Sequence, residues 1–321
     1  MLDTLIIGAG PIGLACAIEA RKRGMRAAVF DKGCLANSLY HFPTDMTFFS
    51  TPDLVEIGGL PFICRDMKPT RSEALEYYRR AAEYFQLDVR LYEAVQRIEG
   101  SDGAFEIHTV RDKYSAPKVI AAVGFFDRPR MLNVPGEDLE KVIHYYREAH
   151  PFAGQKVLIV GGGNSAVIAA LECHRRGAKT TVAVRSSSFH DGVKYWLLPD
   201  ILNRIQSGEV RAYFNTVVTE VKPKSVSMMG RDGLCIEIDN DFVLAMTGYE
   251  PDYEFLEAIG VQIGEDDCRT PVHDPQTYET NRPGIYLAGV VVGGLRTNQW
   301  FIENSRDHAA VIFDHIESSS R

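Results

Sequence analysis

Short apolar runs that end at a glycine-rich turn recur along the chain and alternate with amphipathic stretches. Residues 2–7 (LDTLII) lead directly into GAGPIG, and residues 156–160 (KVLIV) lead into GGGNSA. A stretch with helical periodicity follows each turn, to about Gly24 in the first copy and about Arg176 in the second. The pattern therefore predicts two copies of a strand, tight turn and helix, which is typical of an α/β fold with parallel sheets.

In the first copy, a second strand from Arg26 to Phe30 ends at Asp31. Gly8 allows the tight turn, Gly10 lets the backbone approach a pyrophosphate, and Gly13 lets the helix pack close to the strand. The phosphates would lie at the helix N-terminus, where free N–H groups favour negative charge. An acid at the end of the second strand can accept hydrogen bonds from ribose hydroxyls. Because the motif starts within the first ten residues, as in many flavoproteins, we expect FAD at this site.

In the second copy, Gly161, Gly163 and Ala166 occupy the three small-residue positions, and the strand TTVAV ends at Arg185. A guanidinium at this point can bind a 2′-phosphate through paired hydrogen bonds, whereas a carboxylate would repel it. The second site should therefore prefer NADPH to NADH. Lys194 is a candidate for a second phosphate contact, although a solvated lysine would fit the pattern equally well.

Two further strands that close on glycine, residues 118–124 (KVIAAVG) and 242–248 (FVLAMTG), flank the second copy. We therefore expect an NADPH-binding domain, residues 121–248, inserted into an FAD-binding domain, residues 1–120 and 249–321. After the insertion, the strand GIYLAG (Gly284 to Gly289) should precede a helix from about Asn298 to Ile316. The N-terminus of that helix would point at the flavin ring.

Composition and charge narrow the function. Hydrophobic residues make up 45% of the chain and charged residues 24%, which is typical of a globular protein. The formal net charge of -8 gives no footprint for nucleic acid. The chain runs from Met1 directly into a strand, so we expect no signal peptide and no membrane contact, and a cytoplasmic location. The six cysteines are scattered without a C-x-x-C pair or a cluster that would bind a metal.

Taken together, these segments resemble the low-molecular-weight thioredoxin reductase-like flavoproteins, which have two Rossmann-like dinucleotide-binding domains. The chain is more closely similar to one branch of them, the bacillithiol disulfide reductase family. The similar segments are PTDMTFFS (43–50), HYYREAHPF (144–152), MTGYEPDYEF (246–255), TYETN (277–281) and WFIEN (300–304).

The resemblance implies a role in redox homeostasis, with FAD, NADPH as hydride donor, the disulfide of a small glucosamine-linked thiol as acceptor, and a homodimer or homotetramer. Phe49, Ser50 and Asn298 should lie near the flavin ring. The expected FAD-binding residues are Gly8, Gly10, Pro11, Ile12, Gly13, Asp31, Lys32, Phe49, Ser50, Val95, Gly124, Gly289 and Asn298. The expected NADPH-binding residues are Gly161, Gly163, Asn164, Ser165, Arg185 and Lys194.

The sequence also departs from the family. Thioredoxin reductases have a C-x-x-C pair just before the second glycine motif, where this chain has HYYREAHPF, so a dithiol relay to thioredoxin is excluded. Some bacillithiol disulfide reductases have a cysteine inside the first glycine motif, where this chain has Ile12. Cys16, one helical turn later, is the single candidate for a catalytic cysteine, although its position favours packing against the sheet. Val290 stands where the fold usually has an acid that holds the ribitol.

Two alternative functions stay open. Some members of this fold lack cysteines and pass single electrons, so a ferredoxin- or flavodoxin-NADP reductase is one alternative. Those small carriers are acidic, and a net charge of -8 argues mildly against docking them. The second alternative is a non-catalytic flavoprotein that senses NADPH. Such a protein would have both nucleotide sites but would reduce any electron acceptor only slowly.

Overall fold

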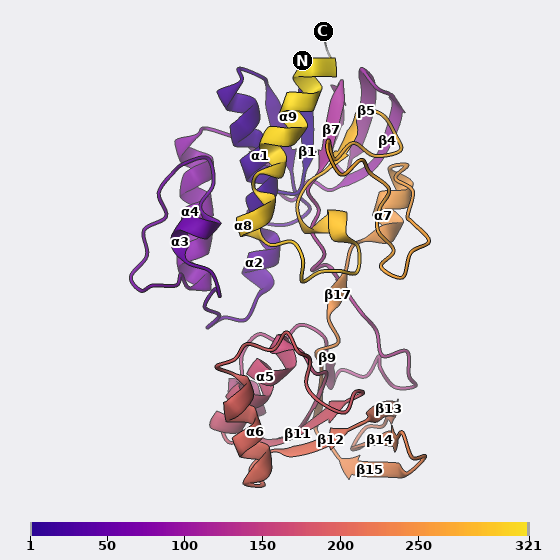
Figure 1. The fold of residues 1–321 in the computed structure, drawn as a ribbon. Coiled ribbons are helices and arrows are strands. Elements are labelled where there is room, and N and C mark those ends of the chain that lie inside the picture. The colour runs from indigo at the N-terminus through magenta and orange to yellow at the C-terminus, as the bar shows by residue number, and fades with distance from the viewer. Residues whose placement is uncertain (1, 320–321) are drawn as a thin grey trace. The chain divides into compact units, whose positions relative to one another are not determined.

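The computed structural model describes residues 2–319 and divides into two compact units, coloured along the chain in Figure 1. Unit 1 contains Met1–His41, Asp45–Arg128 and Tyr249–Arg321, and unit 2 contains Phe42–Thr44 and Pro129–Gly248. The long segment of unit 2 is thus inserted into the sequence of unit 1. It begins at Pro129 and not at the expected residue 121, because the strand over 118–121 belongs to the sheet of unit 1.

Unit 1 is built on a five-stranded parallel sheet with the order β18-β7-β1-β2-β3 and on a three-stranded antiparallel sheet with the order β4-β5-β6. The strands are β1 (Thr4–Ile7), β2 (Ala27–Phe30), β3 (Asp88–Arg90), β4 (Val95–Ser101), β5 (Ala104–Thr109), β6 (Lys113–Ala116), β7 (Lys118–Ala121) and β18 (Ile285–Leu287). The helices are α1 (Pro11–Lys22), α2 (Asn37–His41), α3 (Pro52–Val55), α4 (Arg71–Tyr84), α7 (Tyr253–Ala258), η2 (Val290–Gly293), α8 (Ile302–Ser305) and α9 (His308–Ser319).

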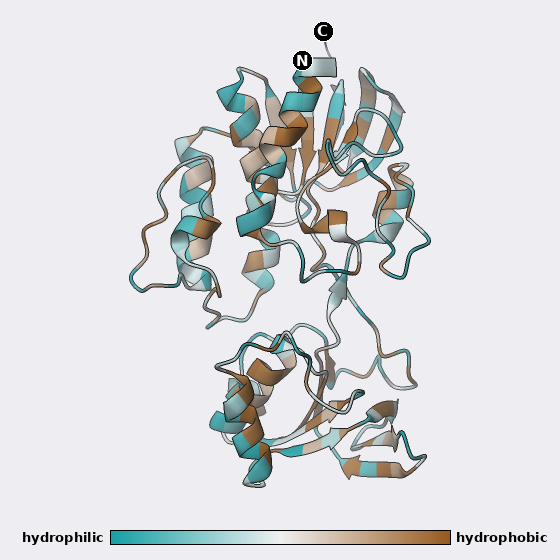
Figure 2. Cartoon of the chain, in the orientation of Figure 1, coloured by the Kyte–Doolittle hydropathy of each residue, from teal (hydrophilic) through white to brown (hydrophobic). Residues whose placement is uncertain are grey.

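The parallel sheet of unit 1 is buried on both faces, as its almost uninterrupted apolar strands require. Alternate residues such as Leu5, Ile7 and Phe30 pack on one face against Phe105 and Ile107 of the antiparallel sheet. On the other face α1 packs against β1, β2 and α9. Figure 2 shows the hydrophobic colour concentrated on the central strands, whereas α4 and α9 carry a mixture of hydrophilic and hydrophobic residues.

Unit 2 repeats this plan. Its five-stranded parallel sheet has the order β12-β11-β10-β16-β9, and its antiparallel sheet has the order β13-β14-β15. The strands are β9 (Val142–Ile143), β10 (Lys156–Val160), β11 (Lys179–Val184), β12 (Arg211–Phe214), β13 (Thr216–Val221), β14 (Ser225–Gly230), β15 (Cys235–Asp239) and β16 (Phe242–Ala245). The helices are η1 (His150–Phe152), α5 (Asn164–Arg175) and α6 (Leu198–Gln206), and β8 (Arg128–Pro129) pairs with β17 (Tyr249–Glu250) where the chain crosses between the units.

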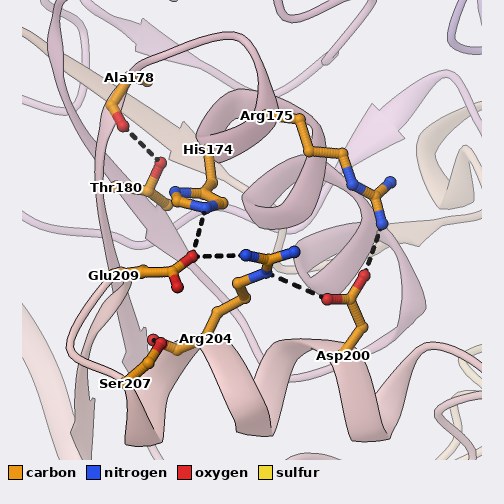
Figure 3. A network of polar contacts seen from close by, with 8 residues as sticks. All are labelled: His174, Arg175, Ala178, Thr180, Asp200, Arg204, Ser207 and Glu209. Carbon is orange, nitrogen blue, oxygen red and sulfur yellow. Dashed lines mark hydrogen bonds and ion pairs between the residues drawn. The ribbon is translucent and has the colours of Figure 1, made fainter.

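A network of charged side chains joins α5 to α6 on the surface of unit 2 (Figure 3). Arg204 donates to Asp200 at 3.2 Å and to Glu209 at 2.6 Å. His174 and Arg175, at the end of α5, contact Glu209 and Asp200 at 3.0 and 2.5 Å. Because these groups are exposed or half-buried, the apolar contacts beneath them contribute more to docking α6 than the ion pairs do.

The glycine-terminated strands expected from the apolar pattern are confirmed, with β10 covering residues 156–160 as predicted. The single helix expected from about Asn298 to Ile316 is wrong. The chain is not helical at Asn298, and residues 306–307 separate the short α8 from α9. At this break the Arg306 guanidinium donates to the carbonyls of Asp53 and Glu56, both at 2.8 Å, so a tertiary contact favours the interruption.

Candidate functional site

The first glycine turn connects β1 to α1 and has the close contacts that require glycine. Gly8 adopts a φ of +106°, and a Cβ on it would lie 2.4 Å from the Ala122 carbonyl oxygen. A Cβ on Gly13 would lie 1.8 Å from the Gly8 carbonyl oxygen, so any side chain there would push α1 away from the turn. By contrast, a Cβ on Gly10 would meet no atom within 4 Å, which leaves open space for a ligand against the backbone.

The N-terminus of α1 lies at this open space. Gly10 is its N-cap and provides no side-chain hydrogen bond, and Pro11 occupies the first turn. The free N–H groups of this twelve-residue helix are therefore available to an anion and reinforced by the helix dipole.

Asp31, directly after β2, is fixed across the same turn. Its two carboxylate oxygens accept hydrogen bonds from the Ala9 and Gly33 N–H groups, both at 2.8 Å. Burial raises the pKa of Asp31, and these two N–H donors oppose the rise. The carboxylate keeps acceptor capacity for the hydroxyls of a ribose bound in front of the turn. A glycine cradle, an uncapped helix and an anchored acid together fit the adenosine and pyrophosphate of a dinucleotide.

Four other residues expected at the FAD site lie in the strands and turns of unit 1. Gly289 has a φ of +88°, and a Cβ on it would lie 3.3 Å from the Ile12 side chain, so Gly289 packs against the glycine turn. Gly124 follows β7 with a φ of +71°, and Val95 is buried in the core of unit 1. Lys32 is exposed and pairs with Asp127 at 2.9 Å.

Residues expected near the flavin ring lie in less regular segments. Phe49 is 41% exposed, and Asn298 is exposed in the loop before α8. Ser50 donates a hydrogen bond to Glu303 on α8. This contact links the 49–50 segment to α8, and sequence reasoning missed Glu303 because it belongs to a stretch that was expected to be one long helix.

Sequence reasoning also missed His308. Its Nδ1 accepts the Gly289 N–H at 3.2 Å, directly before Val290, which stands where the fold usually has an acid. The ring stacks on Tyr278 with centroids 4.1 Å apart, and burial, reinforced by His273, lowers the pKa of His308 to about 4. The neutral imidazole of His308 thus stabilises the turn that follows β18. No local sequence pattern around His308 indicates this contact.

The second glycine turn, between β10 and α5, repeats the first. Gly161 has a φ of +144°, and a Cβ on it would lie 2.4 Å from the Met246 carbonyl oxygen. Gly163 caps α5 without a side-chain hydrogen bond, and a Cβ on it would meet no atom within 4 Å. Ser165 is exposed in the first turn of the helix. This turn can therefore accept a second pyrophosphate in the same manner.

Arg185 directly follows β11, the position that Asp31 occupies after β2. It is exposed and forms no hydrogen bond or ion pair with another residue in the described range 2–319. Lys194, half-buried in the loop after β11, donates its backbone N–H to the Asn164 side chain at 2.9 Å. The two units thus present opposite charges at equivalent strand ends.

The cysteines are all free, and none pairs with another in the described chain. Cys16 lies in α1 with 0% exposure, and burial raises the pKa of its thiol to about 12. Cys173 in α5 is equally buried, with a pKa of about 12. Thiols in this environment stay protonated at neutral pH and are poor nucleophiles.

Glu99 on β4 and Glu106 and His108 on the central strand β5 form a group with the spacing of a metal site. Two cations already neutralise it, since Lys113 pairs with Glu106 at 3.0 Å and Arg97 pairs with Glu99 at 2.9 Å. Arg97 also donates to Nδ1 of His108 at 3.1 Å, and Nε2 of His108 lies 2.7 Å from a Glu106 carboxylate oxygen. The two carboxylates of the group are therefore already paired with cations of the chain.

The family model described as pyridine nucleotide-disulphide oxidoreductase matches residues 5–289. The bacilliredoxin reductase Bdr of Bacillus subtilis (strain 168) is 40% identical over 313 residues, which are 97% of this chain and 96% of the relative. The solved bacillithiol disulfide reductase Bdr of Staphylococcus aureus superposes with a TM-score of 0.96 at 38% identity, covering 100% of this chain and 99% of that one. A ferredoxin–NADP reductase of Ignicoccus hospitalis is more distant, at 24% identity over 90% of each chain.

Proposed function

The chain belongs to the pyridine nucleotide-disulphide oxidoreductase family, whose members use FAD and NADPH, and from that premise we propose that it reduces bacillithiol disulfide. The reaction consumes NADPH, a proton and one disulfide, and it yields NADP⁺ and two thiols. Its support is the similarity over nearly the whole length to reductases named for bacillithiol disulfide and bacilliredoxin.

In unit 1, Gly8, Gly10 and Gly13 would admit the pyrophosphate of FAD, and Asp31 would bind the ribose of its adenosine. Bound FAD supplies a ring that accepts a hydride and gives up two electrons. The residues of this chain bind and orient it. His308, through the Gly289 N–H, would fix the turn after β18.

The observation that carries the assignment of the two sites is the exchange of charge at equivalent strand ends. Asp31 follows β2, and Arg185 follows β11. A carboxylate suits free ribose hydroxyls, whereas an exposed guanidinium suits a 2′-phosphate. We therefore assign NADPH to unit 2. Gly161 and Gly163 would lie at its pyrophosphate, and Ser165, Arg185 and Lys194 would also contact the nucleotide.

The variant Arg185→Ala tests this assignment. Hydrogen bonds to charged groups contribute roughly 1.5–3 kcal/mol, so kcat/KM for NADPH should fall about ten- to hundredfold. The value for NADH should change little, because NADH has no 2′-phosphate. Arg175→Ala, which removes an arginine of the α5–α6 network, is the matched control. Equal losses for both nucleotides would contradict the assignment.

The disulfide acceptor would be reduced without a cysteine relay through Cys16, since that thiol is buried and protonated. The proposal also includes a cytoplasmic location and assembly into a homo-oligomer, both of which the family resemblance supports. Size-exclusion chromatography with light scattering would measure the size of the oligomer. A protein disulfide on a bacilliredoxin is a second candidate acceptor, because the Bacillus subtilis relative is named for it.

A further inference from the structure

The loop that follows β11 is tied to the second glycine turn by one side chain. Asn164, the first residue of α5, donates from Nδ2 to the Gly192 carbonyl at 3.0 Å. Its Oδ1 accepts the Lys194 backbone N–H at 2.9 Å. The amide of Asn164 therefore makes two hydrogen bonds to this loop, with one of its two N–H groups and with its oxygen.

Other contacts show that this loop is ordered. The His190 N–H donates to the Gly162 carbonyl in the glycine turn at 2.8 Å, and Val193 N–H donates back to His190 at 2.9 Å. Phe189 and Val193 are buried in the core of unit 2, at 5% and 6% exposure. The Asn164 amide adds two contacts after this turn, to Gly192 and to the Lys194 N–H, just before the Lys194 carbonyl accepts the Leu197 N–H at 2.9 Å.

The loop begins at Arg185 and returns to the N-terminus of α5 at Lys194. One end thus carries the cation that we assign to the 2′-phosphate, and the other end lies at the turn that we assign to the pyrophosphate. Because Asn164 fixes the second end of the loop to the turn, it determines where the Lys194 backbone lies relative to the proposed sites of the 2′-phosphate and the pyrophosphate.

We propose that Asn164 is a positioning residue for recognition of the 2′-phosphate, which acts by holding the 190–194 segment against the glycine turn. This inference rests on the proposed NADPH site in unit 2. The family resemblance implies direct contact of Asn164 with the nucleotide, whereas the proposed role acts through the hydrogen bonds of its amide to Gly192 and Lys194.

The test is binding of 2′,5′-ADP and 5′-AMP to the full-length, FAD-saturated protein by isothermal titration calorimetry. Saturation with FAD keeps both probes out of the site in unit 1. For Asn164→Ala we expect the Kd of 2′,5′-ADP to rise about five- to tenfold and that of 5′-AMP to rise less than twofold. Asn203→Ala, at an exposed position of α6, is the matched control and should change neither value.

A double-mutant cycle identifies the route of the effect. If Asn164 acts by placing Lys194, the losses of Asn164→Ala and Lys194→Ala on 2′,5′-ADP binding should be less than additive in free energy. In steady state, the NADPH preference should fall mainly through KM, because the hydride-donating ring is remote from the 2′-phosphate. Asn164→Ser, too short to make either hydrogen bond, should behave like Asn164→Ala and serves as the second variant if the first is unstable.

Equal weakening of both probes would overturn the proposal, since it would mean that Asn164 acts on the adenosine 5′-phosphate that the two probes share. Fully additive losses with Lys194→Ala would overturn it as well. The assignment of the NADPH site fails separately, if Arg185→Ala leaves the ratio of 2′,5′-ADP to 5′-AMP affinity unchanged.

Discussion

Asp31 and Arg185 stand at equivalent strand ends and differ in how they are held. Asp31 is fixed by two backbone N–H groups, which suits it to bind neutral hydroxyls at defined positions. Arg185 is exposed and makes no such contact within residues 2–319, which leaves its guanidinium to a charged ligand. At the scale of single residues, charge and preorganisation thus support the proposed assignment of a ribose to Asp31 and of a 2′-phosphate to Arg185.

The buried thiol of Cys16 leads to a prediction about disulfide reduction. We expect Cys16→Ala to keep its FAD and its rate of disulfide reduction within about twofold, because a thiol with a pKa of about 12 does not attack a disulfide at neutral pH. Cys173→Ala, at an equally buried position of α5, is the matched control. Loss of disulfide reduction in Cys16→Ala alone, with flavin reduction by NADPH intact, would show instead that Cys16 takes part.

His308 gives a prediction on pH. Its pKa in the folded chain is about 4, below the ordinary value of 6.5, so the unfolded chain binds the proton more readily. The contribution of neutral His308 is complete above pH 6.5 and is lost as the pH falls towards 4. One pKa unit corresponds to about 1.4 kcal/mol, so the loss amounts to about 3 kcal/mol at most.

Denaturant unfolding at pH 7, 5.5 and 4.5 measures this effect. His308→Asn keeps an acceptor for the Gly289 N–H and removes the titration, so its free energy of unfolding should fall less on acidification than that of the parent. His41→Asn, at an exposed histidine, should follow the parent. Parallel curves for the parent and His308→Asn would contradict the prediction.

At the scale of elements, α4 shows how one helix supports the segment expected at the flavin ring. The helix begins with a capping box, in which Thr70 and Glu73 exchange side-chain and backbone hydrogen bonds. Its Tyr77 hydroxyl donates to the Leu60 carbonyl at 2.8 Å, and its Tyr78 hydroxyl donates to the Val55 carbonyl at 2.7 Å. These contacts hold α3 and the chain after it, next in sequence to Phe49 and Ser50.

Removal of the cap by Thr70→Ala should lower the free energy of unfolding by about 1 kcal/mol. The reason is that the Glu73 N–H loses its acceptor at the start of a fourteen-residue helix. Thermal unfolding followed by circular dichroism measures the change. Ser72→Ala, exposed in the same turn, is the control, and an equal shift in both variants would mean that the cap does not stabilise the fold.

Elements defined by local patterns could be predicted from the sequence, whereas those defined by tertiary contacts could not. Apolar strands ending on glycine indicated both parallel sheets, because such runs must be buried on both faces. The break between α8 and α9 depends on Arg306 reaching carbonyls some 250 residues earlier in the chain, which no window of sequence contains. The contacts of Glu303, His308 and Asn164 depend in the same way on residues distant in sequence.

At the scale of the whole molecule, the two units share one plan, and we assign a different nucleotide to each. Both units stack a parallel sheet between helices and a small antiparallel sheet, and the segment 129–248 is inserted within the other unit. No helix within residues 2–319 is long and apolar enough to span a membrane. The net charge of -8 offers little attraction to an acidic electron carrier, which favours a small disulfide over ferredoxin as the acceptor.

The most direct test of this account is anaerobic reduction of the FAD-loaded protein by NADPH, followed by rapid mixing with candidate acceptors. Stopped-flow absorbance of the flavin would be followed with bacillithiol disulfide, with a bacilliredoxin in its disulfide form and with ferredoxin. We predict rapid reoxidation by bacillithiol disulfide, unchanged in Cys16→Ala. Reoxidation by ferredoxin alone would contradict the proposed acceptor and make the protein a ferredoxin-NADP reductase, with both nucleotide sites as assigned.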